Sequence, residues 1–576
     1  MEALFMNHLA PLENHSHENI EASATQSGGH MPNNISKYPY IIVGSGMGGG
    51  MVARQLFNDN STSFKGDDSE ARVMLLEKGG LGFHTHCLNT SRAHFAHRSQ
   101  GGRGRDNEVM FDQYLDYKRT RYELKCTEEW CGGGSVFELG GRSLFWSLEA
   151  PSIRHDRLKH FFPPSVATDL EDENTSASGG SSTGDGGVDI VQVREGWYTK
   201  AKRILANSPP GDVNYPSQNV SIEIIDEVSE AKANLRQALG MVATTTVDPT
   251  PNGAEFADAN NLYYFAQNAY STLDWILDKA INQERQNSAP LAPGLNLEVK
   301  KFTVKNGRVT ELFINNGRFE VSRNQTVILC AGTVNTAAIA LRSSGLPKCV
   351  QDKIGKNLTD HEIWMTRYWK KMNTDEYKAK KAIELSGYVR VRGHEALLTV
   401  CQHAEKFYGH GFADGDGDTD ANAECVSVLN IMFEFEAELN TKGAVSLDYK
   451  DDPVIEMNRE RLDSSSDFVN ELNAICRAIR FQFGFLVCRP CVDQVQLASW
   501  GSVAHEVGTM RMDSCGGDDG VVDSNLKVKG VDNLYVCDLS VFPCSPMENP
   551  SATLTALAMR LAAHLKDLER DKTGNE

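Results

Sequence analysis

The sequence predicts an α/β protein (α+β overall), in which a domain built on a parallel sheet is joined to a second domain built on a mostly antiparallel sheet. The first domain is indicated by the buried strand YPYIIVG at 38–44, by the helix start GMVARQLF, and by the apolar strand ARVMLLEKG at 71–79. The second is indicated by the strands SGYVRVRG, CVSVLNIMFEFEAEL and GAVSLDYK, spread over 386–450. With 576 residues, 40% of them hydrophobic, the chain can bury a core large enough for two or more domains.

Five glycines lie between Gly44 and Gly50, after the first strand and before the helix. The spacing Gly44-x-Gly46-x-x-Gly49 is typical of a Rossmann-like dinucleotide-binding turn. Gly44 permits the tight turn, Gly46 lets backbone N–H groups approach a pyrophosphate, and Gly49 lets the helix pack on the sheet, while the positive helix end favours phosphate. Glu77, at the tip of the next strand, is placed to hydrogen-bond a ribose hydroxyl. A tight turn without a ligand is the alternative interpretation.

Turn signals and composition shifts predict the remaining organisation. The segment 297–332 alternates apolar and polar residues around KNGR and NNGR, which predicts a β-meander that leads into a buried strand, VILCAG. Residues 168–188 are acidic and of low complexity and predict a mobile surface insertion, and 414–420 resemble another. We expect a disordered leader at 1–37, a dinucleotide-binding domain formed by 38–214, 291–361 and 501–576, a substrate or lid region at 215–290, and a substrate-binding domain at 362–500.

The last helix has the clearest signal. In NPSATLTALAMRLAAHLKDL, leucines recur at helical spacing, at Leu554, Leu557, Leu561 and Leu565. Asn549 and Pro550 stand where an N-cap and a first helical residue are expected.

Composition excludes several partners. The formal net charge is -19, and no block of Lys and Arg is dense enough to follow a phosphate backbone, so nucleic acid is excluded. There is no basic, apolar signal segment and no apolar run of the ~18 residues that a membrane helix needs. The 13 cysteines are scattered and odd in number, which favours free thiols. The sequence therefore predicts a soluble cytoplasmic protein, with a homo-oligomer left open.

The glycine motif does not choose between NAD and FAD, but five further blocks do. In chain order they are ELGGRSLFWS (138–147), VILCAGTVNTAAIALRSSGL (327–346), IGKNLTDH (354–361), VAHEVGTMRM (503–512) and VDNLYVCDLSVFPCSPMENPSATLTALAMRLA (531–562). Together they resemble the FAD-binding signatures of the glucose-methanol-choline (GMC) oxidoreductases, over most of 38–80, 138–155, 297–361 and 440–565. HEVGTMRM followed by ENPSATLTALA is most similar to the pyranose-oxidase-like branch and related sugar or glycoside oxidoreductases.

The resemblance implies a catalytic pair, His505 and Asn549. To oxidise an alcohol, a hydride leaves carbon for flavin N5 while the hydroxyl loses its proton, and a neutral imidazole suits that proton near neutral pH. Asn549 would orient the same hydroxyl. A buried structural histidine is the alternative for His505, and an N-cap role is the alternative or additional role for Asn549.

The resemblance also assigns the cofactor side of the site. A helix that starts at Pro550 would place its positive end near the negative charge of a reduced flavin. Phe145 stands where pyranose oxidases carry a histidine that links covalently to FAD, so we expect non-covalent FAD. Ser147 matches a position near the flavin N5 and is alternatively a polar loop residue. The expected FAD-binding residues are Gly44, Ser45, Gly46, Gly48, Gly49, Glu77, Gly141, Arg142, Ser143, Trp146, Ser147, Val299, Ala331, Gly332, Asp538, Pro550 and Thr553.

We expect no metal site. In DGDGDTD the sixth position of a calcium loop is Thr419 and the twelfth is Cys425, which fails the ligand pattern. HTHC at 84–87 and the pair Cys126 and Cys131 lack a complementary second pair.

The expected function is therefore FAD-dependent oxidation of a CH–OH group in a sugar, glycoside, polyol or similar small molecule, with oxygen or another electron acceptor. A lyase on the same fold that cleaves hydroxynitriles, or an alcohol-oxidising step of secondary metabolism, is the main alternative. An NAD-dependent dehydrogenase leaves the C-terminal blocks without a role, and a binding protein leaves His505 and Asn549 idle.

Overall fold

The computed structural model describes most of the chain. The described residues are 38–57, 73–82, 85–86, 123–126, 134–175, 192–206, 222–240, 247–250, 269–286, 291–315, 317–373, 376, 380, 383–404, 425–457, 461–463, 465–485, 494–501 and 503–573. The expected leader at 1–37, most of the insertion at 168–188 and the loop at 414–420 lie outside these residues.

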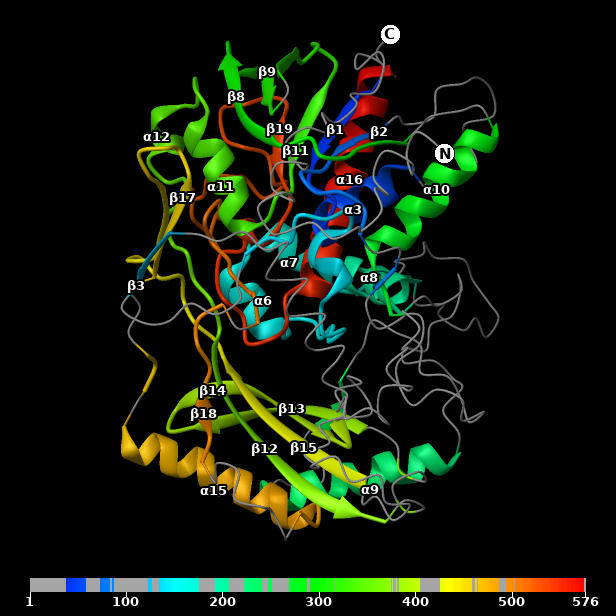
Figure 1. Cartoon of the computed structure of the whole chain (residues 1–576), viewed down its shortest axis with the longest axis vertical. Coiled ribbons are helices and arrows are strands. Elements are labelled where there is room, and N and C mark those ends of the chain that lie inside the picture. Colours follow the sequence, from blue (N-terminus) through cyan, green and yellow to red (C-terminus); the bar gives the residue numbers. More distant parts are fainter. Residues whose placement is uncertain are drawn as a thin grey trace, which may run out of the picture.

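A parallel five-stranded sheet forms the first domain, as predicted from its apolar strands. Its strand order is β19 (Leu534–Val536), β11 (Thr326–Leu329), β1 (Tyr40–Val43), β2 (Val73–Leu76) and β7 (Leu291–Gly294). β1 and β2 are buried along their whole length, since helices and further chain cover both faces. Helix α3 (Met47–Phe57) packs against α16 (Ser551–Thr573) and α10 (Thr272–Gln286), beside the sheet (Figure 1).

The predicted meander is present as an antiparallel sheet of β8 (Val299–Lys305), β9 (Arg308–Ile314) and β10 (Gly317–Glu320). Asn306 and Gly307 both have positive φ, 51° and 72°, which is the backbone that a tight Asn-Gly hairpin turn requires. Phe302, Val309 and Leu312 of the meander belong to the same hydrophobic core as the parallel sheet. The chain then enters β11 and helix α11 (Thr333–Arg342).

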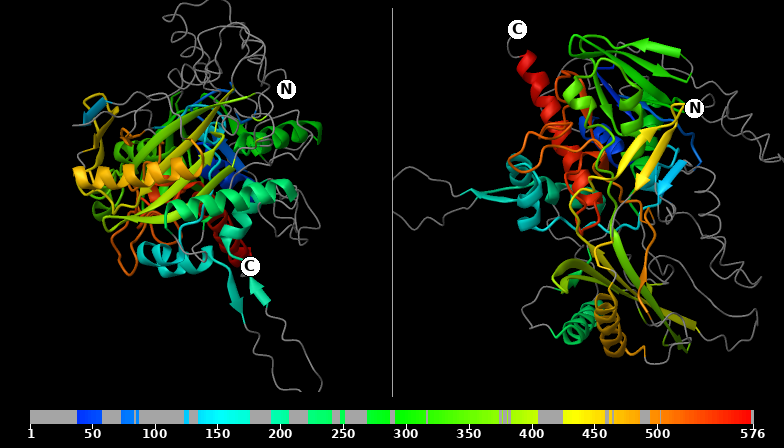
Figure 2. Two further views of the ribbon diagram at one scale, coloured as in Figure 1. Left: turned by 90° about the horizontal axis from the view of Figure 1, so that it is seen from below. Right: turned by 90° about the vertical axis from the view of Figure 1, so that its left-hand side faces the viewer.

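The second domain contains a six-stranded sheet with its own core. The strand order is β18 (Gln496–Leu497), β12 (Glu362–Met372), β15 (Cys425–Phe435), β14 (His394–Gln402), β13 (Ile383–Val391) and β6 (Val247–Pro249), and every pairing is antiparallel. One face packs on α9 (Ile222–Ala238) and α15 (Ser466–Gln482), which cross it side by side (Figures 1 and 2). Because strand side chains alternate, Leu429, Ile431 and Phe433 face these helices, while Asn430, Met432 and Glu434 face the other way.

The segment GAVSLDYK does not join this sheet, contrary to the prediction. It supplies β16 (Ala444–Leu447), which pairs with β17 (Pro453–Met457), and β17 pairs in parallel with β3 (Glu123–Cys126). β16 and β17 pack on α11 of the first domain. Alternation identified the strand but carries no information about which sheet it enters.

The range 215–290 is divided between the two domains. α10 packs on α3 and β7, whereas α9 packs on β6, β13 and α15. The expectation of a substrate or lid region stays a prediction, because much of the range lies outside the described residues. Of its described helices, α9 buries Ala231 and Leu235 against the sheet face that points away from Asn430 and Glu434.

The expected insertion at 168–188 begins later than its composition predicts. Its first residues complete helix α7 (Pro164–Leu170), where Leu170 is buried, and then form β4 (Glu173–Thr175), which pairs with β5 (Gln192–Arg194). Figure 2 shows this hairpin projecting beyond α7. α7 contacts α6 (His155–Phe161) and α8 (Trp197–Leu205). A short helix, α12 (Lys348–Gln351), follows α11 along the chain. Within the described ranges, none of the helices combines the length and apolar character needed to cross a bilayer.

Candidate active site

A cavity of about 670 Å³ lies between the two domains. It extends from the glycine-rich turn after β1 to the face of the antiparallel sheet that α9 and α15 leave uncovered. The sheet contributes Met365, Arg367, Thr399, Asn430 and Glu434 to its wall. Concave spaces of this size between domains are the usual place for a cofactor and a small substrate.

The glycines of the turn have different roles. A Cβ on Gly44, whose φ is +99°, would lie 2.3 Å from the carbonyl oxygen of Cys330, and one on Gly49 would lie 2.0 Å from that of Gly44. A Cβ on Gly48 would likewise lie 2.0 Å from the carbonyl oxygen of Cys537. A Cβ on Gly46 would meet nothing within 4 Å, and Gly46 lines the cavity. Three glycines therefore permit close packing, and Gly46 leaves space for a ligand to approach the backbone.

Glu77 fixes the same turn. Its Oε2 accepts hydrogen bonds from Ser45 N at 3.1 Å and Ser45 Oγ at 2.6 Å, and its Oε1 accepts one from Gly79 N at 2.8 Å. Burial raises the pKa of Glu77, and these hydrogen bonds act against that rise. The side chain lines the cavity, so it is available to a ribose hydroxyl and also holds Ser45 in place.

Most of the expected FAD-binding residues line this cavity. They are Gly44, Ser45, Gly46, Gly48, Glu77, Gly141, Arg142, Ser143, Trp146, Ser147, Val299, Ala331, Gly332, Asp538 and Pro550. Asp538 also joins two turns, because its Oδ2 accepts from Gly332 N at 2.9 Å and from Thr336 Oγ1 at 2.5 Å. Gly49 and Thr553 do not line it: Gly49 packs on Gly44, and Thr553 shares a hydrogen bond of 2.9 Å with the Tyr198 hydroxyl.

His505 is held beside His361 by a short antiparallel bridge between Thr359 and Val507. Val507 N donates to Thr359 O at 2.8 Å, and Thr359 N donates to Val507 O at 3.2 Å. Moving two residues along each strand of such a bridge leads to His361 and His505, which therefore face each other. Their Nδ1 atoms are 3.3 Å apart, and their rings are 78° from parallel.

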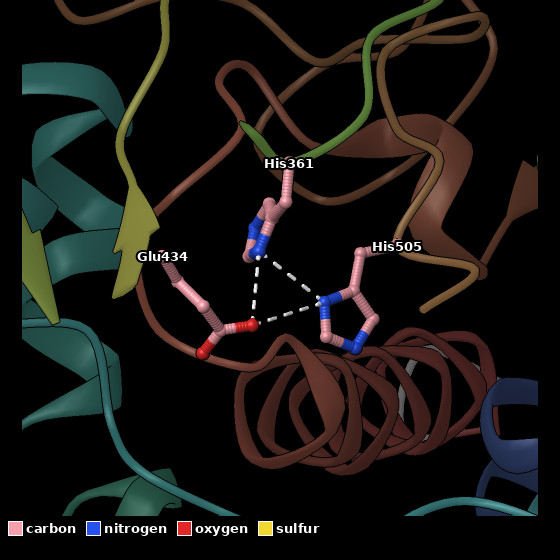
Figure 3. Close-up of side chains that lie close together, drawn as sticks. All are labelled: His361, Glu434 and His505. Carbon is pink, nitrogen blue, oxygen red and sulfur yellow. Dashed lines mark hydrogen bonds and ion pairs between the residues drawn. The ribbon is translucent and has the colours of Figure 1, made fainter. Parts of the chain in front are cut away.

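Glu434 completes a buried cluster with the two histidines (Figure 3). It lies on β15 opposite Ile363 of β12, so it is diagonal to His361 on the same face of the sheet. Its Oε1 is 3.5 Å from Nδ1 of His361 and 4.0 Å from Nδ1 of His505. The ligating atoms lie within 4.8 Å of one another, and the contact between the two Nδ1 atoms is the shortest of the three. Among the described residues the cluster offers three ligand atoms, one fewer than a structural zinc site uses.

Burial and neighbouring charges favour the neutral forms of His505 and Glu434. Burial, then His361 and Arg142, hold the pKa of His505 well below its ordinary value, so the imidazole is neutral at pH 7. Burial and the neighbouring Asp360 raise the pKa of Glu434 to about 8. Burial also raises the pKa of Asp360 to about 6, with Glu506 adding to the rise.

Asn549 is not the N-cap of α16, contrary to one of the predicted roles. The first helical hydrogen bond runs from Leu554 N to the carbonyl oxygen of Pro550, at 2.9 Å, so Pro550 holds the cap position and Asn549 precedes it. The Asn549 side chain is 4% exposed, and its Oδ1 makes no hydrogen bond within the described part of the chain. Because Asn549 lines the cavity, this buried acceptor is available to a bound molecule.

The cavity fits the group that the sequence implies. Gly46 leaves open space at the start of α3, and Pro550 and Ser551 place the N-terminus of α16 at the same cavity. Two positive helix ends therefore face it, one suited to a pyrophosphate and one to negative charge on a flavin.

Sequence reasoning missed His361 and Glu434. His361 ends the block IGKNLTDH, and Glu434 interrupts the apolar strand CVSVLNIMFEF. A carboxylate inside an apolar strand was the available signal, because burying an unpaired carboxylate costs free energy and such a residue is therefore a candidate for function. The pairing of β12 with β15, which brings the two residues together, has no counterpart in local sequence.

Residues 487–558 match the protein family described as GMC oxidoreductase. A curated protein, Dehydrogenase str4 of Strobilurus tenacellus, is 39% identical to the chain over 87 residues. That match covers 14% of this chain and 14% of the length of that protein.

Two solved structures share the fold over nearly the whole chain. Pyridoxine 4-oxidase from Mesorbium loti has a TM-score of 0.53 at 18% identity, covering 92% of this chain and 99% of its own. A formate oxidase variant from Aspergillus oryzae RIB40, solved to study FAD modification, has a TM-score of 0.55 at 14% identity, covering 93% of this chain and 99% of its own. At these identities the likeness concerns the fold.

Proposed function

We propose that the chain is a glucose-methanol-choline (GMC) oxidoreductase, the family whose model matches residues 487–558, and that it uses FAD to oxidise a CH–OH group of a sugar, glycoside, polyol or similar hydroxylated small molecule. One observation supports this above the others: a neutral His505 and the unpartnered Oδ1 of Asn549 line the same cavity as the glycine-rich turn. This arrangement provides a proton acceptor and a hydroxyl-orienting group beside a dinucleotide site.

The FAD-binding residues of the proposal are those that line the cavity, from Gly46 and Glu77 at one end to Ser147 and Pro550 at the other. When bound, FAD would supply the hydride acceptor. Phe145 lines the cavity and has no nucleophilic atom, which supports a non-covalent cofactor. Gly49 and Thr553 would act only indirectly, Gly49 through packing on Gly44 and Thr553 through its hydrogen bond with Tyr198, since neither lines the cavity.

The protein's own residues would prepare the substrate hydroxyl. His505 accepts its proton at Nε2, because Nδ1 faces His361 and Glu434, and Figure 3 shows the other ring nitrogen directed away from them. Asn549 orients the same hydroxyl through its side-chain amide, whose NH₂ group can donate to the hydroxyl oxygen without competing for the hydroxyl proton. Thr399 and Asn430 each have an oxygen atom buried without a hydrogen-bond partner in the described residues, and both line the sheet wall, where substrate hydroxyls would satisfy them.

The proposal also assigns a different function to each domain. The parallel-sheet domain would bind FAD, and the antiparallel sheet would form the substrate wall. Oxygen or another small molecule would accept the electrons, and we retain the cytoplasm as the proposed location because the cysteines are scattered and odd in number.

The test is a visible spectrum of the purified protein before and after acid precipitation, followed by anaerobic titration with sugars, glycosides, polyols and simple alcohols. We expect a yellow protein that releases its flavin into the supernatant and is bleached by one substrate class. Yellow colour retained in the pellet would contradict non-covalent binding. A yellow protein that cleaves hydroxynitriles, and that none of these compounds bleaches, would indicate the lyase instead.

A further inference from the structure

We infer that Glu434 and His361 are positioning residues for His505, and that the Glu434 carboxylate holds His505 in the tautomer whose Nε2 can accept the substrate proton. This inference rests on the proposed function, in which His505 is the proton acceptor. It assigns a role to His361 and Glu434, which are part of neither the dinucleotide motif nor the catalytic pair expected from the sequence.

The geometry directs both histidines toward one oxygen. Nδ1 of His361 is 3.5 Å from Glu434 Oε1, and Nδ1 of His505 is 4.0 Å from the same atom. The two Nδ1 atoms are 3.3 Å apart, so the three atoms form a compact triangle (Figure 3). Small movements of the side chains bring both nitrogens within hydrogen-bond distance of the carboxylate.

Counting protons shows why the carboxylate matters. If His361 donates from its Nδ1 to Nδ1 of His505, a neutral His505 carries its proton on Nε2 and cannot accept another there. If both Nδ1 atoms are protonated, each needs an acceptor, and Glu434 Oε1 is the acceptor that both can reach. The ionised carboxylate therefore selects the reactive tautomer, and the cluster changes from a charge of −1 to neutral when Nε2 takes the substrate proton.

Burial makes this charge balance significant. The side chains of His361 and Glu434 are 0% and 1% exposed, and that of His505 is 13% exposed. Neither oxygen of Glu434 has a hydrogen-bond partner within the described residues. A buried carboxylate with no donor is costly to keep, and a nearby imidazolium formed during the reaction would offset that cost.

The surrounding charges determine the pH dependence. Asp360 is a neighbouring carboxyl that opposes ionisation of Glu434, Glu506 opposes that of Asp360, and the guanidinium of Arg142 opposes a positive charge on His505. Burial and Asp360 raise the pKa of Glu434 to about 8, so its ionised fraction grows as pH rises through that value. The rate of substrate oxidation should rise over the same interval.

The experiment compares Glu434→Gln with Glu436→Gln in FAD-loaded protein. Glu436 lies two residues along the chain, is paired with Arg157 and does not line the cavity, so its substitution is a matched removal of one carboxylate. We expect Glu434→Gln to slow anaerobic flavin bleaching by about tenfold or more and to abolish the rise near pH 8. Glu436→Gln should retain the wild-type pH profile.

A second readout does not depend on the flavin or the substrate. Diethyl pyrocarbonate modifies an unprotonated imidazole nitrogen, and peptide mass spectrometry reports its rate at His505 in protein freed of FAD. We expect Glu434→Gln to lower that rate at pH 9 severalfold, and Glu436→Gln to leave it unchanged. If no substrate bleaches the wild type, the proposed function fails, and the modification rates still decide the role of Glu434.

Three results would overturn the inference. The first is a Glu434→Gln protein whose bleaching profile and His505 modification rate equal those of the wild type. The second is loss of wild-type activity on treatment with EDTA. That loss would indicate that the cluster binds a metal ion and not the proposed protons. If Glu434→Gln does not fold, His361→Gln is tested in its place. In that variant we expect the rise in the rate of flavin bleaching to move to higher pH, because Glu434 loses a hydrogen-bond donor. An unchanged profile in that variant is the third such result.

Discussion

The Asn549 side chain is the residue-scale feature that most clearly separates function from stability. Its Oδ1 is buried, lines the cavity and makes no hydrogen bond in the described residues, and Pro550 holds the cap position of α16. Asn549 therefore contributes little to the stability of α16. Its buried side chain is instead placed to contact a molecule bound in the cavity. The sequence located Asn549 correctly beside the helix start but could not distinguish a cap from a cavity residue, because the two differ by one position along the chain.

Asn549→Ala should therefore reduce activity without the usual cost of losing a cap. We expect the rate of anaerobic flavin bleaching to fall tenfold to a hundredfold, since a buried hydrogen bond is worth about 1–3 kcal/mol. The free energy of unfolding should change by less than the ~1 kcal/mol typical of cap removal. Stopped-flow reduction and urea unfolding measure the two effects. A large loss of stability with unchanged reduction would restore the N-cap role.

Gly46 and Gly49 offer a matched pair of substitutions within one turn. Gly46→Ala should weaken FAD binding and leave the stability of the FAD-free protein nearly unchanged, because its Cβ would project into open space where the ligand approaches. Gly49→Ala should destabilise the protein itself by about 1–3 kcal/mol, because its Cβ would lie 2.0 Å from the carbonyl oxygen of Gly44. Thermal unfolding with and without FAD separates the two. Equal effects of both substitutions would contradict this assignment.

At the scale of elements, a buried contact joins β13 to the start of α16. The Tyr388 hydroxyl donates to Glu548 Oε1 at 2.7 Å, and Arg154 N donates to the same oxygen at 3.1 Å. The guanidinium carbon of Arg154 lies 4.9 Å from the centre of the Tyr388 ring, and its Nη2 lies 2.8 Å from Glu395. Because Glu548 precedes Asn549, this contact positions the proposed hydroxyl-orienting residue relative to the antiparallel sheet.

Glu548 should make stability depend on pH. Burial raises its pKa to about 7, although hydrogen bonds from Tyr388 and Arg154 oppose the rise. Between about pH 4.5 and pH 7 the folded protein holds a proton that the unfolded chain releases, so the free energy of unfolding falls as pH increases. Glu548→Gln removes this effect. We expect the Tm of the variant, relative to wild type, to rise between pH 5 and pH 8.

Glu395→Gln is the control for this prediction. Burial would raise the pKa of Glu395, but hydrogen bonds from Arg390 and Arg154 outweigh it and lower the value. Its ionised form is stabilising above the unfolded pKa, and this stabilisation is lost only as pH falls below that value. The Tm difference between Glu395→Gln and wild type should therefore be the same at pH 5 and pH 8. A parallel drift in both variants would assign the pH dependence to other groups.

The elements also show where local sequence is informative. The parallel strands, the meander and α16 were predictable, because apolar runs, Asn-Gly turns and leucine spacing are local signals. The strand Ala444–Leu447 was recognisable, but its sheet was not, since pairing with Pro453–Met457 and packing on α11 depend on distant residues. The same limit applies to His361 and Glu434, which the register of β12 and β15 brings together.

On the scale of the whole molecule, the cavity lies between two separate hydrophobic cores. Residues from both domains line it, so in the proposed function a cofactor at the glycine-rich turn would leave the antiparallel sheet as the wall that faces the substrate. The family blocks predicted residues that line the parallel-sheet side of the cavity, whereas the sheet wall, with Thr399 and Asn430, carries no motif. Substrate recognition is therefore the part of the site that the sequence left undetermined.

Removal of FAD should lower the thermal stability of the whole molecule. A ligand that binds only the folded state stabilises it by about 2.7 kcal/mol at a concentration of 100 times its Kd. We expect the Tm of FAD-free protein to rise with added FAD in a concentration-dependent manner, and this rise to be smaller in Gly46→Ala. Differential scanning fluorimetry over a range of FAD concentrations measures it. A Tm that does not respond to FAD would contradict the proposed cofactor site.

The order of strands in the parallel sheet affects how the protein is made. Four of its five strands, β1, β2, β7 and β11, are synthesised before the long antiparallel section, but the edge strand β19 and helix α16 follow that section. α16 then returns to the beginning of the chain, where Lys566 Nζ donates to Gln55 O at 2.8 Å and the Tyr40 hydroxyl donates to Glu569 Oε2 at 2.9 Å. During translation, the parallel sheet and the packing of α3 on α16 can therefore be completed only after the antiparallel section has been synthesised, so the apolar strands near the glycine-rich turn stay without these partners until then.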